Sequence, residues 1–247
     1  MKKLTKYILI GAVSLLAVGG ATFGVIQALD TTNEPTGGDT PPVTVESYLS
    51  TPKNIELSLN LKLSTTTWKE ETEYILSWDY VTHAEKFCIT IGEKEFYTTT
   101  IMQQSYDISS AVTVGETYDI KVKAIGDGIT YGDSENGVIT ETIKKVTSNL
   151  VYEELEDGTY SVAKSSGDIV IDGPLVLPDT YEGEIITVIP QGGFEENYHD
   201  DTMSIFAQKG ITSVRFPKYL KKLGYRAFWC CMKLKSIVLP ESVKEYE

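Results

Sequence analysis

Apolar and polar residues alternate along several short segments in the first half of the chain. The alternation is cleanest over residues 55–63 and 118–124, and the same period of two returns over 74–78 and 87–91. A further strand is expected over 138–143. A period of two buries one face of an extended segment and leaves the other in water, so each segment is predicted to be an antiparallel strand. Turn-forming stretches such as "DYVTHAE" and "GDGITYGDSENG" separate the segments, and no helical period appears. The pattern therefore predicts an all-β sandwich.

This half of the chain resembles a fibronectin type III domain over residues 52–146. The segments that carry the resemblance are "YILSWDYVTHAEKFCITI" and "SYDISSAVTVGETYDIKVKAIGDGITYGDSE". They contain the tryptophan of the second strand, Trp78, and a Gly-x-x-Tyr-x-x-x-Val-x-Ala pattern that starts at Gly115 and includes Tyr118. The resemblance implies seven strands in a Greek key, with Trp78 and Tyr118 in the core and Tyr118 as the tyrosine corner.

A repeat with a period of 23 appears in the second half, which we take as residues 147–247. Residues 211–220 match residues 234–243 at a constant offset of 23. Residues 189–194 match residues 223–228 at an offset of 34, which exceeds one period and therefore indicates an insertion. A fixed period of about 20–29 residues, with Leu or Ile at constant positions, is typical of a leucine-rich repeat solenoid.

The second half also resembles the BspA-like leucine-rich repeats of microbial surface proteins. The matching segments are "LVLPDTYEGEIITVIPQGGF" and "AFWCCMKLKSIVLP". The resemblance implies that Cys231 is a buried, inert filler of the repeat interior. The sequence ends at Glu247, part-way through a period. We therefore expect a truncated solenoid that is a fragment of a longer array, with an uncovered parallel strand through Ile237 to Leu239.

The N-terminal residues 1–30 have the pattern of an export signal or a membrane anchor. Three lysines precede Tyr7–Leu29, a segment without a single charge. As a helix this segment would be about 34 Å long, enough to cross a hydrocarbon core of about 30 Å. The lysines in front of it predict an N-terminus inside and the rest of the chain outside. An uncleaved anchor and a cleaved signal, which would make the protein secreted, both remain open. Residues 31–51 are rich in Thr, Pro and Gly and predict a spacer.

The charge and the reactive residues exclude several functions. The chain has 22 basic and 35 acidic side chains and a net charge of −13, which disfavours nucleic-acid binding. Its two histidines, His83 and His199, have no metal-ligand spacing, and no P-loop, G-x-S-x-G or H-E-x-x-H motif occurs. Asp127, Asp133 and Glu135 share a loop but do not have the spacing of an EF-hand. We therefore expect no catalytic residue, no cofactor and no metal.

Taken together, the patterns predict a mainly β, exported, cell-surface binding or adhesion protein. Its leucine-rich repeats would be the interaction surface, held on a fibronectin type III-like stalk, with an extracellular protein or glycan as the ligand and a membrane contact through the N-terminal helix. Two alternatives remain: a non-catalytic N-terminal part of a larger exported enzyme, such as a cell-wall or polysaccharide hydrolase, and a structural envelope spacer. The acidic insertion over 195–201 is expected to be a solvated loop. The two halves are expected to unfold separately, and the sequence identifies no ligand-binding residue.

Overall fold

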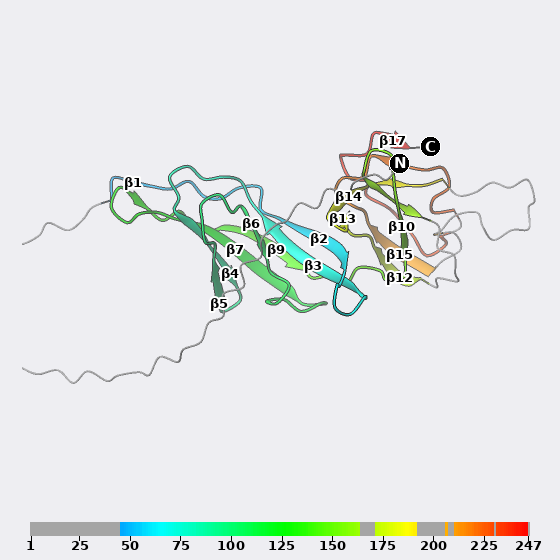
Figure 1. Cartoon of the computed structure of the whole chain (residues 1–247), viewed down its shortest axis with the longest axis horizontal. Helices are drawn as coiled ribbons and strands as arrows, with labels where there is room; N and C mark the ends of the chain where they lie inside the picture. Colours follow the sequence, from blue (N-terminus) through cyan, green and yellow to red (C-terminus); the bar gives the residue numbers. More distant parts are fainter. Residues whose placement is uncertain (1–44, 164–170, 192–205, 207–209, 230, 247) are drawn as a thin grey trace, which may run out of the picture. The chain divides into compact units, whose positions relative to one another are not determined.

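The computed structural model describes residues 45–163, 171–191, 206, 210–229 and 231–246, and these residues form strands and turns without a helix (Figure 1). The predicted mainly β fold is confirmed for this part of the chain. No helix in it is long and apolar enough to cross a membrane. The span predicted over Tyr7–Leu29 lies outside the described residues.

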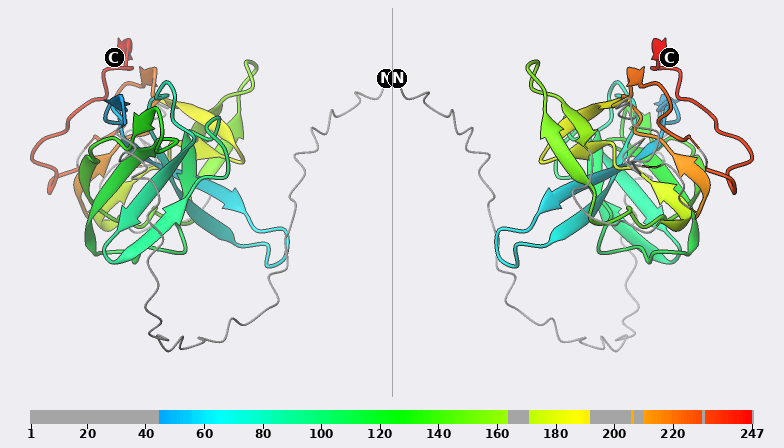
Figure 2. Two further views of the ribbon diagram at one scale, coloured as in Figure 1. Left: turned by 90° about the vertical axis from the view of Figure 1, so that its left-hand side faces the viewer. Right: turned by 90° about the vertical axis from the view of Figure 1, so that its right-hand side faces the viewer.

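The first half consists of two antiparallel sheets. In one sheet β2 pairs β3 and β3 pairs β6, and in the other the order is β5-β4-β7-β9. Both views of Figure 2 show β2 and β3 as a long hairpin, coloured blue and cyan. The strands are β2 (Glu56–Leu63), β3 (Glu70–Ser77), β4 (Lys86–Ile91), β5 (Lys94–Tyr97), β6 (Ser105–Asp107), β7 (Thr117–Ile125) and β9 (Gly137–Thr142).

The inner faces of the two sheets share one hydrophobic core. The alternating residues identified in the sequence supply its centre, and their side chains are between 0% and 4% exposed: Leu59, Leu61, Leu76, Phe87, Ile89, Ile120, Val122 and Ala124. Trp78 is 5% exposed, and its ring centroid lies 5.2 Å from that of Phe87. The predicted core position of Trp78 is therefore confirmed.

The sandwich begins before residue 52. Strand β1 (Ser47–Tyr48) pairs in parallel with β8 (Tyr131–Gly132), and Leu49 is 7% exposed in the sandwich core. The composition of residues 31–51 predicts a spacer that includes residues 45–51. In the structure these residues belong to the sandwich, because Leu49 packs into its hydrophobic core and β1 pairs with β8. Residues 31–44 lie outside the described part of the chain.

Tyr118 lies at the start of β7 and has the hydrogen bond expected of a tyrosine corner. Its hydroxyl accepts a hydrogen bond from the backbone N–H of Thr113 at 3.2 Å. The ring packs against the sandwich core but is only half-buried. The corner is therefore present, whereas full burial of Tyr118 is a prediction that the structure corrects: its β-strand position leaves one side of the ring in solvent.

Replacing Tyr118 with Phe should lower the free energy of unfolding by about 0.5–1.5 kcal/mol, the usual net value of one hydrogen bond. The value should lie at the lower end because water reaches the freed N–H of Thr113, which lies in an exposed region. Denaturant unfolding with an unchanged m-value would measure it. Tyr97→Phe is the control, since the Tyr97 hydroxyl donates a hydrogen bond to the exposed side chain of Glu95. A loss no greater than that of the control would contradict a stabilising corner.

The second half consists of short strands joined mostly in parallel. Strands β11, β14, β16 and β17 pair in parallel in that order, and β12 pairs in parallel with β15. Strand β10 forms an antiparallel hairpin with β11. The strands are β10 (Val151–Glu154), β11 (Tyr160–Ala163), β12 (Asp172–Val176), β13 (Thr180–Tyr181), β14 (Glu184–Ile189), β15 (Gly210–Arg215), β16 (Lys222–Leu223) and β17 (Glu245–Tyr246).

The strand register reproduces both offsets found in the sequence. Ile189 pairs with Leu223, which is the longer offset, and Leu223 pairs with Tyr246, which is the shorter one. Successive copies of the pattern therefore lie next to one another, as the repeat predicts. The prediction of a parallel strand over Ile237–Leu239 is wrong, since this segment forms no strand and Val238 is 85% exposed. Leu239 nevertheless packs against the core, so side-chain contacts hold this segment without a backbone ladder.

A second hydrophobic core fills the repeat half. Its fully buried members come from both parallel ladders and the turns between them, and they include Leu175, Leu177, Ile186, Ile189, Ile211 and Leu220. Cys231 is 8% exposed, and its thiol donates a hydrogen bond to the carbonyl oxygen of Phe206 at 2.9 Å. The predicted burial of Cys231 is therefore confirmed.

Candidate binding pocket between the sandwich and the repeat half

A tight hairpin of the repeat half joins the sandwich sheet. Strands β13 and β14 are connected by Glu182 and Gly183, with φ angles of 52° and 89°. Two positive φ angles are typical of a type I′ turn, which suits the twist of a two-residue hairpin. The turn brings β13 against β2, where Thr180 pairs with Asn60 and Tyr181 pairs with Leu61 in parallel. One continuous sheet therefore runs from the repeat half into the sandwich.

A buried ion pair fixes this junction. The Asp179 side chain is 1% exposed and lies 2.7 Å from the guanidinium of Arg215, whose side chain is 20% exposed. Both Arg215 terminal nitrogens donate to the carboxylate, at 3.0 and 2.7 Å. The same carboxylate accepts the backbone N–H of Leu59, on β2, at 2.9 Å and that of Lys218 at 2.7 Å. A buried carboxylate with this many donors is fully paired, so Asp179 connects three segments of the chain.

Aromatic packing reinforces the same junction. Tyr152 and Tyr181 stack with ring centroids 4.5 Å apart, and both contact the sandwich core as well as the repeat core. Burial of Tyr152 raises the pKa of its phenol, with smaller contributions from Glu70 and Tyr181. The shared sheet, ion pair and aromatic contacts therefore favour a single unfolding transition, in place of the separate transitions expected from the sequence.

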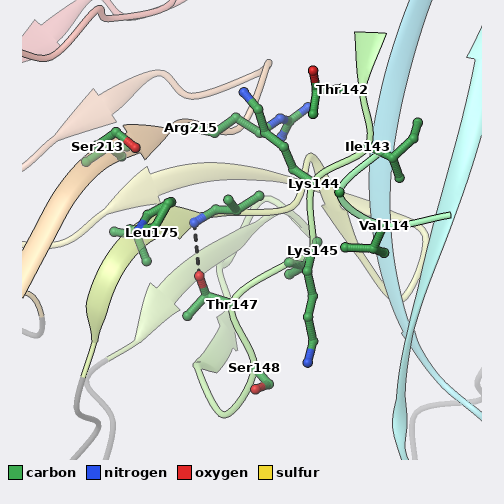
Figure 3. Close-up of a pocket in the computed structure, with 15 residues that line it drawn as sticks. Val114, Thr142, Ile143, Lys144, Lys145, Thr147, Ser148, Leu175, Ser213 and Arg215 are labelled. Atoms are coloured by element: carbon green, nitrogen blue, oxygen red, sulfur yellow. Dashed lines mark hydrogen bonds between the residues drawn. The ribbon is translucent and has the colours of Figure 1, made fainter. Parts of the chain in front are cut away.

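A pocket of about 620 Å³ opens beside this junction, between the two halves (Figure 3). One wall is the segment that leaves the sandwich, residues 142–148, together with residues 114–115. The opposite wall is formed by residues 174–176 of β12 and residues 213–215 of β15. The volume lies within the range of about 300–1,000 Å³ that is usual for ligand pockets.

Hydrogen bonds hold the backbone of the first wall at both ends. At the sandwich end, the Tyr74 hydroxyl donates to the carbonyl oxygen of Lys144 at 2.9 Å, and Gly115 N–H donates to that of Ile143 at 2.8 Å. At the repeat end, Thr147 and Val176 exchange two hydrogen bonds of 2.9 Å, one of them to the Thr147 hydroxyl. The side chains of Lys144 and Lys145 therefore project from a fixed backbone.

The charges that line the pocket are all positive. They belong to Lys144, Lys145 and Arg215, and no Asp or Glu is among the described lining residues. Asp179 offsets the charge of Arg215. Lys144 and Lys145 are exposed and make no ion pair among the described residues. The rest of the lining is mostly aliphatic, from Val114, Ile143, Val146, Pro174, Leu175, Val176 and Val214. Lys144 and Lys145 therefore place two uncompensated ammonium groups beside a largely apolar pocket.

The loop acids considered from the sequence have a structural role. One carboxylate oxygen of Asp127 accepts the backbone N–H groups of Ile129, Thr130 and Tyr131 at 2.8–2.9 Å, and these bonds, led by that of Tyr131, lower the pKa of Asp127. Asp133 pairs with Lys123 at 3.2 Å. No group of three potential metal ligands occurs in the described part of the chain. The acidic insertion over 195–201 lies outside that part.

Sequence reasoning missed the residues that line the pocket. Lys144 and Lys145 lie in the stretch "KKVTSN" at the boundary between the two halves, and no motif in this stretch indicates a function. The sequence feature that could have indicated these two residues is a pair of adjacent lysines at a domain boundary in an otherwise acidic chain. Pockets form preferentially at such boundaries.

Comparison with known proteins gives partial likenesses only. No protein-family model matches the chain, and no curated protein matches it. Among solved structures, the chain is similar to the leucine-rich repeat protein TpLRR of T. pallidum, with 21% identity and a TM-score of 0.31. This likeness covers 41% of the present chain and 42% of the length of TpLRR. A structure described as FN3tt mut is 11% identical, with a TM-score of 0.27, and covers 39% of the present chain and 98% of its own. TM-scores this low do not support a fold assignment. The mainly β fold is therefore assigned from the strand pairings described above.

Proposed function

We propose that the chain is an exported, surface-held binding protein whose ligand enters the pocket between the sandwich and the repeat half. The observation that carries the proposal is the pocket itself: both halves line it, and a shared sheet and a buried ion pair hold its walls. Rigid walls lower the entropic cost of binding, because fewer groups are ordered when the ligand enters.

The finer assignment of the two halves is part of this proposal. Two sheets of three and four strands, together with the Tyr118 hydrogen bond, support a fibronectin type III-like domain. Parallel rungs that follow the sequence period, such as Leu223 beside Tyr246, with apolar residues buried beneath them, support a BspA-like leucine-rich repeat array. The sandwich then acts as a wall of the binding site as well as a stalk for the repeats.

The proposed location follows from the uncharged segment Tyr7–Leu29 behind three lysines. With the N-terminus inside, the pocket faces the exterior, where a protein or glycan ligand is available. The role is binding without catalysis. A place in a larger exported enzyme and a purely structural spacer are the alternatives that the experiment below distinguishes.

The test uses intact cells that carry the full chain and a panel of labelled extracellular matrix proteins and cell-wall polysaccharides. We expect at least one panel member to be captured without being cleaved, and external protease to abolish the capture. Lys144→Glu with Lys145→Glu should reduce capture, whereas Lys94→Glu with Lys121→Glu, on exposed positions outside the pocket, should not.

Three results would overturn the proposal. Cleavage of the captured ligand by the chain would indicate an enzyme. Capture of no panel member would favour a spacer. Capture that survives external protease would contradict the outside location.

A further inference from the structure

We propose that the pocket selects an acidic peptide segment of a protein ligand, in extended form, with carboxylates on Lys144 and Lys145 and aliphatic side chains against its walls. The inference rests on the proposed function and names the ligand class of the same site.

Charge is the first argument. The chain as a whole has a net charge of −13 and therefore repels acidic ligands over most of its surface. The described pocket lining departs from that average, because it contains cations and no carboxylate. Since Asp179 already pairs with Arg215, the two charges available to a ligand are those of Lys144 and Lys145.

The direction of these two side chains is the second argument. Successive residues of an extended segment point to opposite sides. Figure 3 shows Lys145 extending away from Arg215, whereas Lys144 extends toward the side of Arg215. The two ammonium groups can therefore pair with two different carboxylates of one extended ligand more readily than with a single small anion. An extended peptide with an acidic residue at every second position carries several carboxylates, about 7 Å apart along its length, so one ligand can supply a carboxylate to each lysine.

The chemistry of the walls is the third argument, because it separates a peptide from a glycan. Sugar rings pack their C–H faces against aromatic side chains, and none of the described residues that line this pocket is aromatic. Accessible aliphatic residues such as Pro174 and Val214 instead match the aliphatic side chains of a peptide. The exposed hydroxyls of Ser148 and Ser213 can donate to, or accept from, the ligand backbone.

The experiment measures binding of fluorescent probes to intact cells that carry the full chain. The probes are an octapeptide of alternating glutamate and valine, the same peptide with glutamine in place of glutamate, and an octasaccharide containing uronic acids. We expect the glutamate peptide to bind, the glutamine peptide to bind about tenfold more weakly, and binding to weaken as salt rises.

Matched variants assign the effect to the two lysines. Lys144→Glu with Lys145→Glu should weaken binding of the glutamate peptide about tenfold, since each change removes an attraction and adds a repulsion. Lys144→Gln with Lys145→Gln should have a smaller effect of the same sign. Lys94→Glu with Lys121→Glu changes the net charge equally on exposed positions outside the pocket and should leave binding within twofold.

The outcomes separate this inference from the proposed function. If the octasaccharide binds through Lys144 and Lys145 and the peptide does not, the ligand class is wrong and the binding function stands. Equal binding of the glutamate and glutamine peptides also overturns the ligand class. If no probe binds and no panel ligand is captured by the same cells, both the inference and the proposed function fail.

Discussion

Replacing Asp179 with Ala should lower the free energy of unfolding of the compact unit formed by residues 43–247 by about 3–5 kcal/mol, the usual cost of removing one partner of a buried ion pair. The Asp179 side chain is 1% exposed, and its loss leaves the guanidinium of Arg215 without its counter-ion. The substitution also removes the acceptor of two backbone N–H groups, those of Leu59 and Lys218. Because Asp179 connects the sandwich to the repeat half, the single denaturant transition expected of the unsubstituted protein should separate into two.

Two further variants control this experiment. Asp119→Ala removes an exposed carboxylate whose partner is the Thr140 hydroxyl, and should change the stability by less than about 0.5 kcal/mol. Removing both charges with Asp179→Ala and Arg215→Met should cost less than the sum of the two single changes, because neither charge is then buried alone. A loss below about 1 kcal/mol for Asp179→Ala would indicate that the ion pair does not hold the junction.

The long strands of the sandwich could be predicted from the sequence because their burial is periodic. Alternation over 55–63 and 118–124 corresponds closely to β2 and β7, whose side chains face the core and solvent in turn. The short edge strand β5 and the still shorter β6 could not be predicted individually, because so few residues show no period. Local sequence therefore suffices where one face of a strand is buried over several residues.

The repeat half could be predicted through its self-similarity, whereas the junction could not. Both offsets in the sequence reappear as strand register, because equivalent positions of successive copies pair with one another. Pairing of β13 with β2 brings together residues that are far apart in the chain, such as Thr180 and Asn60. Asp179 stands in a polar, turn-forming stretch, which by itself predicts an exposed residue. Its burial depends on partners that only the tertiary structure supplies.

The pocket depends on tertiary structure for the same reason. Lys144 and Lys145 directly follow the sandwich in the chain, but Arg215 comes from β15, deep in the repeat half. No pattern in either segment indicates that they line one pocket. The sequence predicts the class of function through its modules, and the arrangement of the modules defines the site.

Replacing Trp78 with Ala should lower the free energy of unfolding by about 3–5 kcal/mol, as is usual for the removal of a buried aromatic side chain. Trp78 is 5% exposed in the sandwich core, and the substitution would leave a cavity beside the fully buried Phe87. Denaturant unfolding of residues 43–247, followed by circular dichroism, measures the loss.

Trp78→Phe tests which part of the tryptophan matters. The indole Nε1 is buried and has no hydrogen-bond partner among the described residues. A phenylalanine therefore removes no hydrogen bond and also removes an unsatisfied buried donor, which offsets part of the lost packing. We expect Trp78→Phe to cost less than about 1.5 kcal/mol, well below the cost of Trp78→Ala. A loss as large as that of the alanine variant would mean that the Nε1 donates a hydrogen bond to an ordered water or to another part of the chain. In that case the tryptophan of the sandwich core would contribute a polar contact in addition to its volume.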